Sequence, residues 1–138
     1  MHERIRASGH ENVAAAHTST FEVTTDDYLT PAGDCILGID ANRAPAEFDS
    51  GFVAACQEAD ARMTVTIRAG GHEATVEGHG HPGLSFSSDR SAVVRTSEYV
   101  DDRTVMVGAD TAAADLDRGL VAALADGAEL TFELTVSP

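Results

Sequence analysis

Apolar and polar residues alternate along several short stretches of the chain, which is the spacing of β-strands that bury one face. Over residues 13–24 the alternation places Val13, His17 and Phe21 on one side and polar residues on the other. A turn at TPAG follows, and a second strand is expected over 34–40.

Residues 62–78 have a clearer strand pattern. RMTVTIRA (62–69) alternates strictly, and HEATVEG (72–78) follows it after two glycines, Gly70 and Gly71. Two alternating runs separated by two glycines predict a β-hairpin.

Two segments have helical rather than alternating spacing. Phe48, Phe52 and Cys56 recur every four residues after Pro45, which suits the first turn of a helix. In the second segment Leu116, Leu120 and Leu124 form an apolar stripe. Thr111 is the expected N-cap of that second helix.

The phrase at residues 9–30 recurs at 80–101 with an offset of 71, and residues 35–67 align with 105–134 after small shifts. The matches include Gly9-His10 with Gly80-His81 and Tyr28 with Tyr99. Recurrence over the whole chain predicts one domain built from two tandem repeats, about 1–71 and 72–138. We therefore expect an internal duplication with pseudo-two-fold symmetry.

The elements give an α+β fold, with strands in a sandwich or a partly closed barrel and two covering helices. A chain of 138 residues suits a single domain of this kind. It has no apolar run of the length that spans a membrane and no apolar stretch behind the charged opening residues. We expect a cytoplasmic protein without membrane contact.

The charge is strongly unbalanced. Twenty-three acidic residues face nine basic ones, giving −14, and every basic residue is Arg. Charge of this size repels itself in dilute salt, so it suits a cytosol of concentrated salt, as in a halophilic archaeon. The alternative is an acidic surface that selects a cationic partner.

Four phrases spread over the chain resemble one archaeal family: GHENVAAAHTSTFEVT, LTPAGDCILGI, GHGHPGL and DRTVMVGADTAAADLDRGLV. The family is domain of unknown function 371, and we expect a haloarchaeal-type member. The resemblance implies an archaeal cytosolic protein with a mostly β fold and two helices. It implies no activity.

Polar residues present in one repeat and absent from the other are candidates for a site. His17 is the first, as a general base or a metal ligand, with Asp34 and Glu11 as carboxylate partners. The alternative is that His17 bonds the backbone and Asp34 closes its turn. Cys35 beside His17 would be a nucleophile.

The repeated histidines His10 and His81 would line one ligand cleft, or else accept hydrogen bonds from nearby backbone groups. His79 and His81 alternate onto one strand face and are weak candidates for metal ligands. The cofactor is otherwise unknown, and a divalent metal is the one that these residues would suit. A solvated glycine-rich corner is the alternative.

Arg103 is the expected clamp for an anionic ligand, since a guanidinium matches carboxylate and phosphate. With Arg90 and Arg95 it could instead contact RNA. The chain has no basic stripe and few aromatic residues, which counts against nucleic acid.

Two functions of different classes remain. The first is a small-molecule enzyme of hydrolytic or acid-base type, and the alternative is a non-enzymatic binding module for a protein or RNA. Convergence of the polar groups in one pocket would favour the enzyme, and dispersal would favour the module. The substrate and the oligomeric state stay open.

Overall fold

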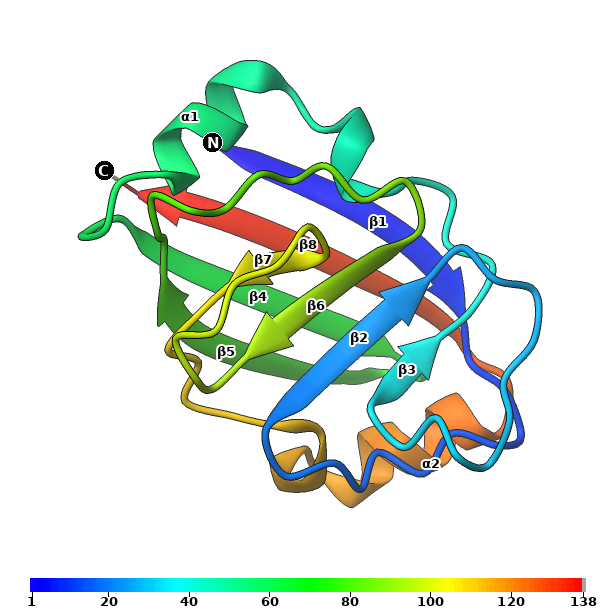
Figure 1. Ribbon diagram of the computed structural model, residues 1–138. Coiled ribbons are helices and arrows are strands. Elements are labelled where there is room, and N and C mark those ends of the chain that lie inside the picture. Colours follow the sequence, from blue (N-terminus) through cyan, green and yellow to red (C-terminus); the bar gives the residue numbers. More distant parts are fainter. Residues whose placement is uncertain (138) are drawn as a thin grey trace.

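Two four-stranded sheets pack face to face in the computed structural model, which describes residues 1–137 (Figure 1). Two short α-helices accompany them, so the fold is α+β. The predicted sandwich is confirmed. The sheets are not closed into a barrel, although isolated bridges join Ser8 to Ile39 and His79 to Val107 at their edges.

The sheet with the longer strands, called the large sheet, has the strand order β1-β8-β4-β5. All of its neighbouring strands are antiparallel. Its strands are β1 (His2–Ser8), β8 (Glu129–Ser137), β4 (Arg62–Ala69) and β5 (His72–His79). Ala69 pairs with His72 across Gly70 and Gly71, and both glycines have positive φ. The predicted hairpin is confirmed.

The smaller sheet has the order β3-β2-β6-β7. Its strands are β2 (Thr20–Thr24), β3 (Ile36–Gly38), β6 (Ser91–Arg95) and β7 (Thr104–Met106). The central pair β2 and β6 is antiparallel, and each edge strand runs parallel to its neighbour.

The strand predicted over 13–24 is shorter than expected, because only its last five residues pair. Ala15 takes φ +46°, which breaks an extended strand. The backbone N–H groups of Ala16 and His17 instead donate to the carbonyl of Asp34. The segment still alternates in burial, so the predicted faces are right although the predicted element is wrong.

Strand β1 is not expected from the sequence, and the strand predicted over 34–40 shrinks to three residues. In β1 only Ile5 and Ala7 supply apolar burial, and the third inward position is Glu3. Glu3 is buried because Arg43 pairs with its carboxylate at 2.9 Å. A partner forty residues away leaves no local signal.

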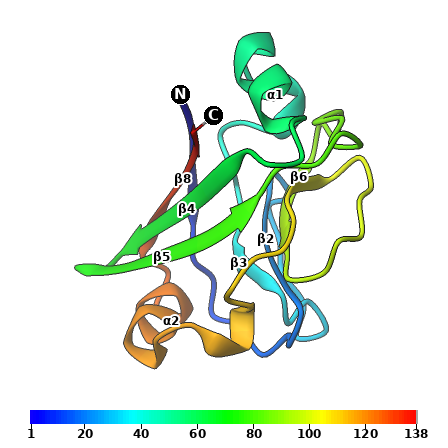
Figure 2. The same cartoon turned by 90° about the vertical axis from the view of Figure 1, so that its left-hand side faces the viewer.

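The helices close the two ends of the sandwich, α1 (Ser50–Cys56) at one end and α2 (Arg118–Ala125) at the other (Figure 2). Each follows a single 3₁₀ turn, Pro45–Glu47 or Ala113–Asp115. Asp49 caps α1, accepting from the N–H groups of Gly51 and Phe52.

Asp117 caps α2 and accepts from the N–H of Leu120 at 3.1 Å. The prediction that Thr111 caps this helix is therefore wrong. The 3₁₀ turn lies between Thr111 and the helix, and the first α-helical residue is Arg118.

The core lies between the sheets. Phe21 of the small sheet meets Phe132 of the large sheet edge to face, with ring centroids 6.4 Å apart. Phe48, Phe52 and Phe86 form a second aromatic cluster at the α1 end. Burial of these rings, together with the aliphatic side chains of the core, is the main favourable contribution to folding.

The two halves have the same order of elements: two strands, a short strand, a 3₁₀ turn, an α-helix and a long strand. Their backbones also share irregular points. Ala15 (φ +46°) and Phe86 (φ +51°) lie 71 residues apart, and Asp40 (φ +54°) and Gly108 (φ +61°) lie 68 apart.

No helix among residues 1–137 combines the length and the apolar character needed to cross a membrane.

Candidate functional site

The imidazole rings of His10, His17 and His81 accept hydrogen bonds from nearby backbone N–H groups. Nδ1 of His17 lies 3.2 Å from the N–H of Ser19 and 3.1 Å from that of Thr20. In the other half, Oγ of Ser88 accepts from the N–H groups of Arg90 and Ser91. An imidazole therefore makes the same turn-closing bonds as a serine 71 residues away.

His10 and His81 form a second such pair. Nδ1 of His10 accepts from Asn12 at 2.9 Å, and Nδ1 of His81 accepts from Gly83 at 2.8 Å. Gly9 and Gly80, which precede them, lie against the carbonyls of Leu124 and Cys56, where a Cβ would collide. These repeated Gly-His pairs hold the chain against the two helices.

The expected partners of His17 do not meet its ring. Within residues 1–137, its ring makes hydrogen bonds only to Ser19 and Thr20, and none to the side chains of Asp34 or Glu11. Asp34 lies close through its backbone carbonyl, and Glu11 is exposed. The catalytic roles given to these residues stay predictions.

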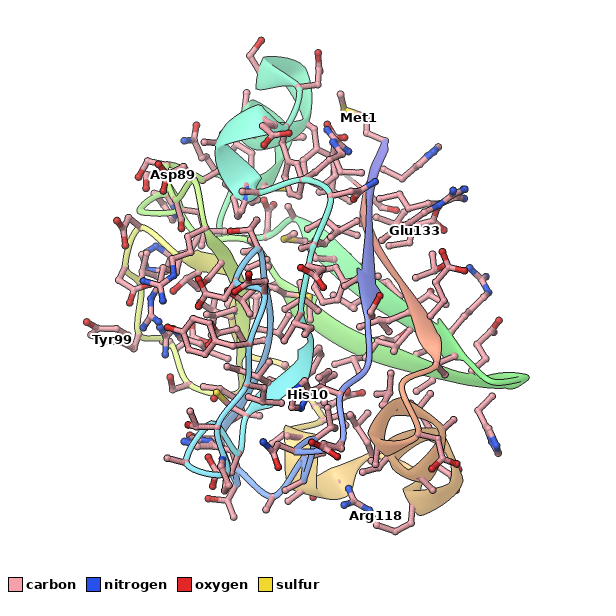
Figure 3. All side chains as sticks on the ribbon, turned by 90° about the vertical axis from the view of Figure 1, so that its right-hand side faces the viewer. Met1, His10, Asp89, Tyr99, Arg118 and Glu133 are labelled. Atoms are coloured by element: carbon pink, nitrogen blue, oxygen red, sulfur yellow. The ribbon has the colours of Figure 1, made fainter. Side chains whose placement is uncertain are left out.

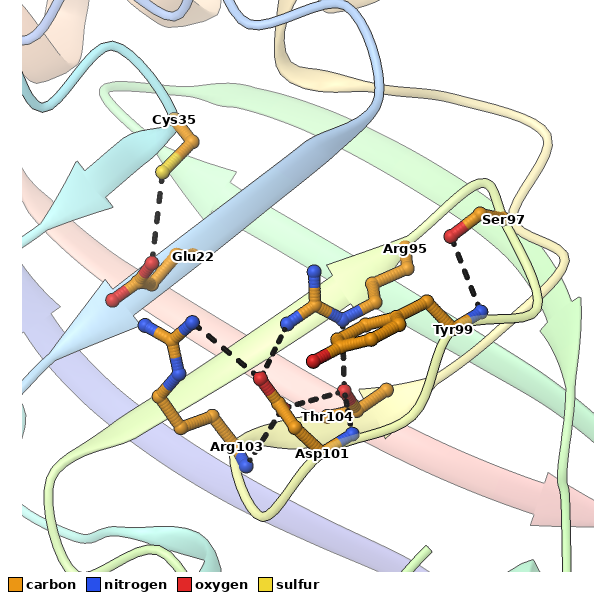
Figure 4. Close-up of polar contacts among 8 residues, drawn as sticks. All are labelled: Glu22, Cys35, Arg95, Ser97, Tyr99, Asp101, Arg103 and Thr104. Carbon is orange, nitrogen blue, oxygen red and sulfur yellow. Dashed lines mark hydrogen bonds and ion pairs between the residues drawn. The ribbon is translucent and has the colours of Figure 1, made fainter. Parts of the chain in front are cut away.

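Cys35 meets a carboxylate rather than a histidine. Its Sγ lies 3.5 Å from Oε1 of Glu22, a buried residue of β2 (Figure 4). Burial, and then the negative charge of Glu22, raises the pKa of the Cys35 thiol to about 11. The thiol is therefore protonated near neutral pH, which weakens it as a nucleophile.

The candidate metal ligands have other partners. Nε2 of His79 lies 3.0 Å from Glu98, and its Nδ1 lies 2.8 Å from the carbonyl of Gly80. Across the part of the chain that the structure describes, no three His, Cys, Asp or Glu side chains are placed to hold a metal ion together.

The polar side chains that do converge lie on the outer side of the small sheet. Because Phe21 and Val23 point into the core, Glu22 and Thr24 of β2 point outward. By the same alternation Arg95 of β6 lies on this side. We call this surface, with loops 25–35 and 96–103, the tyrosine face.

Asp101 organises one end of the tyrosine face (Figure 4). Its carboxylate accepts from Arg95 at 3.0 Å, from the hydroxyl of Thr104 at 2.9 Å and from the backbone N–H of Arg103 at 3.0 Å. Burial acts to raise the pKa of Asp101, but the bond from Thr104 and the contacts with Arg103 and Arg95 outweigh it, so the pKa lies below its usual value.

Arg95 also supports the aromatic ring of Tyr99, with the guanidinium carbon 4.8 Å from the ring centroid. The Arg95 side chain is only 12% exposed, whereas Tyr99 is 61% exposed. Tyr99 projects away from the body of the molecule, on the side opposite Glu133 of β8 (Figure 3). One face of the Tyr99 ring thus packs on Arg95, and most of the remaining side chain is exposed to solvent.

Loop 25–35 forms the other end. Arg90 makes two bonds to the carboxylate of Asp26, at 2.9 and 2.7 Å, and these bonds lower the pKa of Asp26. Tyr28 follows two residues later and is 57% exposed. Arg90, Arg95 and Arg103, the arginines considered above as a nucleic-acid contact, are each paired with an aspartate.

The two tyrosines are the functional candidates that residue-by-residue reasoning passed over. The sequence contains a signal for them, because Asp27-Tyr28 and Glu98-Tyr99 lie 71 residues apart in similar phrases. Among residues 1–137 the large hydrophobic side chains that are exposed are those of Met1, Tyr28 and Tyr99.

Comparison with known proteins gives a family. The model of the family described as domain of unknown function 371 matches residues 5–137. An uncharacterized protein of Methanocaldococcus jannaschii is 39% identical over 132 residues, which covers 96% of this chain and 97% of that protein. Both matches run through the two sheets and the tyrosine face, and the chain therefore belongs to the family domain of unknown function 371.

Proposed function

We propose that this protein is a non-enzymatic binding module and that the tyrosine face docks a protein partner. The observation that carries the proposal is the placement of Tyr28 and Tyr99. They are the only tyrosines of the chain, they occupy matching positions in the two halves, and each is more than half exposed. Exposed aromatic residues are common anchors at protein interfaces.

The partner that fits this face presents cationic side chains. Each tyrosine directly follows an acid, Asp27 or Glu98, and both acids are exposed. An acid beside an open aromatic ring accepts an Arg or Lys through ion pairing and cation–π contact together. The net charge of −14 would also draw a basic surface toward the protein.

The enzyme predicted from the sequence has less support. The ring of His17 already accepts from the backbone, and the raised pKa of Cys35 keeps its thiol protonated. An acid-base or nucleophilic mechanism needs such groups free and near one another. Dispersal of the candidates favours the binding module.

Tyrosine fluorescence provides the test, because the chain has no Trp and both tyrosines lie in the proposed site. We expect a blocked hexa-arginine peptide to change the emission in a saturable way, and a hexa-glutamate peptide to leave it unchanged. The double variant Asp27→Asn, Glu98→Gln should raise the Kd for the arginine peptide at least tenfold.

The matched control removes the same charges elsewhere, in Glu58→Gln, Asp60→Asn, since both residues are exposed in the turn after α1. Equal weakening by both variants, or no response to the arginine peptide, would overturn the proposed partner. Saturable binding of a single-stranded RNA oligomer instead would favour the nucleic-acid alternative.

The parallels between the halves support a further proposal, that the domain arose by tandem duplication of a unit of about half its length. The repeats would be about 1–71 and 72–138. Matching backbone bonds favour it: the carbonyl of Ser88 accepts from Ala46, and the carbonyl of His17 accepts from Ala114. Strands of one half pair with strands of the other, as β2 does with β6. We therefore expect residues 1–71 alone to form a dimer.

We also propose that the protein works in the salt-rich cytoplasm of an archaeon. The acidic excess and the lack of Lys support this habitat. The dependence of thermal stability on salt tests it.

A further inference from the structure

The outer face of the large sheet differs in charge from the rest of the molecule. Its charged outward-facing residues are four arginines and four glutamates, so the face is neutral on balance. The whole chain carries −14, and the imbalance therefore lies entirely outside this face. For two copies of so acidic a protein, this is the surface that approaches with least repulsion.

The charges on this face are sorted by strand. Outward residues of β1 include Arg4 and Arg6, and those of β4 include Arg62 and Arg68. Neither strand carries an outward acid. Two of the four strands are thus purely positive.

The other two strands are purely negative. Outward residues of β8 include Glu129 and Glu133, and those of β5 include Glu73 and Glu77. In the sheet order β1-β8-β4-β5 the charge alternates from plus to minus twice. The edges therefore carry opposite signs, positive on β1 and negative on β5.

Pairing within the sheet uses only part of this charge. Arg4 pairs with Glu133 at 2.8 Å and Arg68 with Glu73 at 2.7 Å. Within residues 1–137 neither Arg6 nor Arg62 forms an ion pair. Ion pairs between neighbouring strands therefore do not explain why Arg6 and Arg62 are present on this face.

We infer that the outer face of the large sheet binds a second copy of this chain, face to face, about a two-fold axis parallel to the strands. Such an axis exchanges β1 with β5 and β8 with β4. Because the pattern alternates over an even number of strands, every strand then faces one of opposite sign. An axis across the strands would instead place each strand over its own copy, with like charges opposed.

One row of side chains shows the consequence. Strand register aligns Arg6 with Thr131, Thr131 with Arg68 and Arg68 with Glu73. The exchange of strands brings Arg6 of one copy to Glu73 of the other, twice over. The unpaired arginine thereby gains a carboxylate.

The shape and size of the face are compatible with this contact. It is hollowed at two places, one of about 400 Å³ bordered by Arg68, Glu73 and Glu129, and one of about 370 Å³ bordered by Arg62 and Glu77. Four strands about 4.8 Å apart and about 27 Å long present roughly 500 Å² per copy. About 1,000 Å² in total is enough for a weak specific dimer.

The sheet edges are less suited to pairing, because other segments already cover them. The carbonyl of Arg6 accepts from Asn42, and the carbonyl of Glu77 accepts from Asp110. Edge-to-edge addition, the usual route of association for an open sheet, is blocked at these points.

Two charge-reversed variants test the inference in solution. Glu73→Arg, Glu77→Arg makes β5 positive, and Arg4→Glu, Arg6→Glu makes β1 negative. By sedimentation velocity at moderate salt, we expect the wild type to dimerise at high micromolar concentration and each variant alone to remain monomeric. An equimolar mixture should form a heterodimer, because each reversed strand then meets an opposite charge.

If the charges serve only the stability of the sheet itself, the mixture of the two variants will form no heterodimer. That result would overturn the inference. A wild type that stays monomeric to about 1 mM would also overturn it. The control Glu58→Arg, Asp60→Arg changes charge equally on another surface and should leave the dimer intact.

If a reversed variant fails to fold, Glu73→Gln, Glu77→Gln is the substitute, and it should raise the dimer Kd at least tenfold. An unchanged Kd would count against the docking face. None of these variants touches the tyrosine face, so the outcome is independent of the proposed partner.

Discussion

The outer faces of the two sheets differ in what covers them. On the large sheet each outward Thr, Arg and Glu side chain is exposed or only partly buried. On the small sheet Thr24, Glu22 and Thr104 also point outward, yet all three are buried. The loop after β6 passes outside the small sheet, whereas among residues 1–137 no comparable loop lies outside the large sheet (Figure 2).

Strand alternation therefore determines which side chains point away from the core, whereas the loops determine whether those side chains reach water. Buried polar groups need partners, and every buried side-chain nitrogen or oxygen within residues 1–137 has one. The tyrosine face is therefore a fixed network with two exposed rings. The large-sheet face is an open array of charges.

The largest expected effect removes what both faces share. Phe132→Ala deletes a fully buried ring that contacts Phe21 across the sandwich. We expect the free energy of unfolding to fall by about 3–5 kcal/mol in chemical denaturation. Thr131→Ala changes the neighbouring residue, which faces outward, and should alter the free energy of unfolding by less than about 0.5 kcal/mol. Two separate unfolding transitions in either variant would show that the faces do not share one core.

A matched pair of threonine substitutions compares the faces directly. Thr104→Val leaves the Nε of Arg95 and the N–H of Asp101 without their acceptor at a buried site, and should lower stability by about 1–3 kcal/mol. Thr66→Val, in the middle of the large sheet, should stay within about 0.5 kcal/mol. Equal losses, measured by thermal melting, would remove the distinction between a covered and an open face.

Salt tests where the unbalanced charge lies. The Debye length shortens from about 30 Å at 0.01 M salt to about 3 Å at 1 M, so potassium chloride should stabilise the protein by about 1 kcal/mol, or roughly 4 °C. Glu58→Gln, Asp60→Asn should reduce this dependence. Glu73→Gln, Glu129→Gln, which unbalances a neutral face, should reduce it less. A melting temperature independent of salt would contradict the habitat proposal.

The smallest effect is the pH dependence from Asp101. Its pKa is lower in the folded protein than in the unfolded chain, where it is about 3.9, so its stabilisation is present above that value and lost as the pH falls through the folded pKa. Asp101→Asn should lower stability by under about 1 kcal/mol at pH 7 and flatten its decline below about pH 4. The unfolding midpoint across pH 2–7 measures both changes.

Local spacing was enough for much of the fold. The hairpin over residues 62–79 and the apolar faces of both helices follow from alternation and helical period. Strand β1 did not, because the burial of Glu3 depends on Arg43. The segment 13–19 kept its alternation but not its strand, because Asp34 takes the N–H groups of Ala16 and His17.

The candidate site was harder to predict. The titratable residues His17 and Cys35 were the leading candidates, and neither side chain bonds to the side chain expected as its partner. The pairing of Asp101 with Arg95 joins two residues six apart through a loop that turns back over the sheet. A turn of that kind has no periodic signal.

The fold class, the similarity of the phrases at residues 9–30 and 80–101 and the excess of acid can be read from the sequence alone, because periodicity, recurrence and charge are properties of residue order. Two features depend on the folded chain: the large sheet sorts its charges by strand, and the small sheet buries its outer polar groups. Both features require strands distant in the chain to become neighbours, as β1 and β8 do. Their order is fixed by packing between the sheets, and residue spacing alone does not encode it.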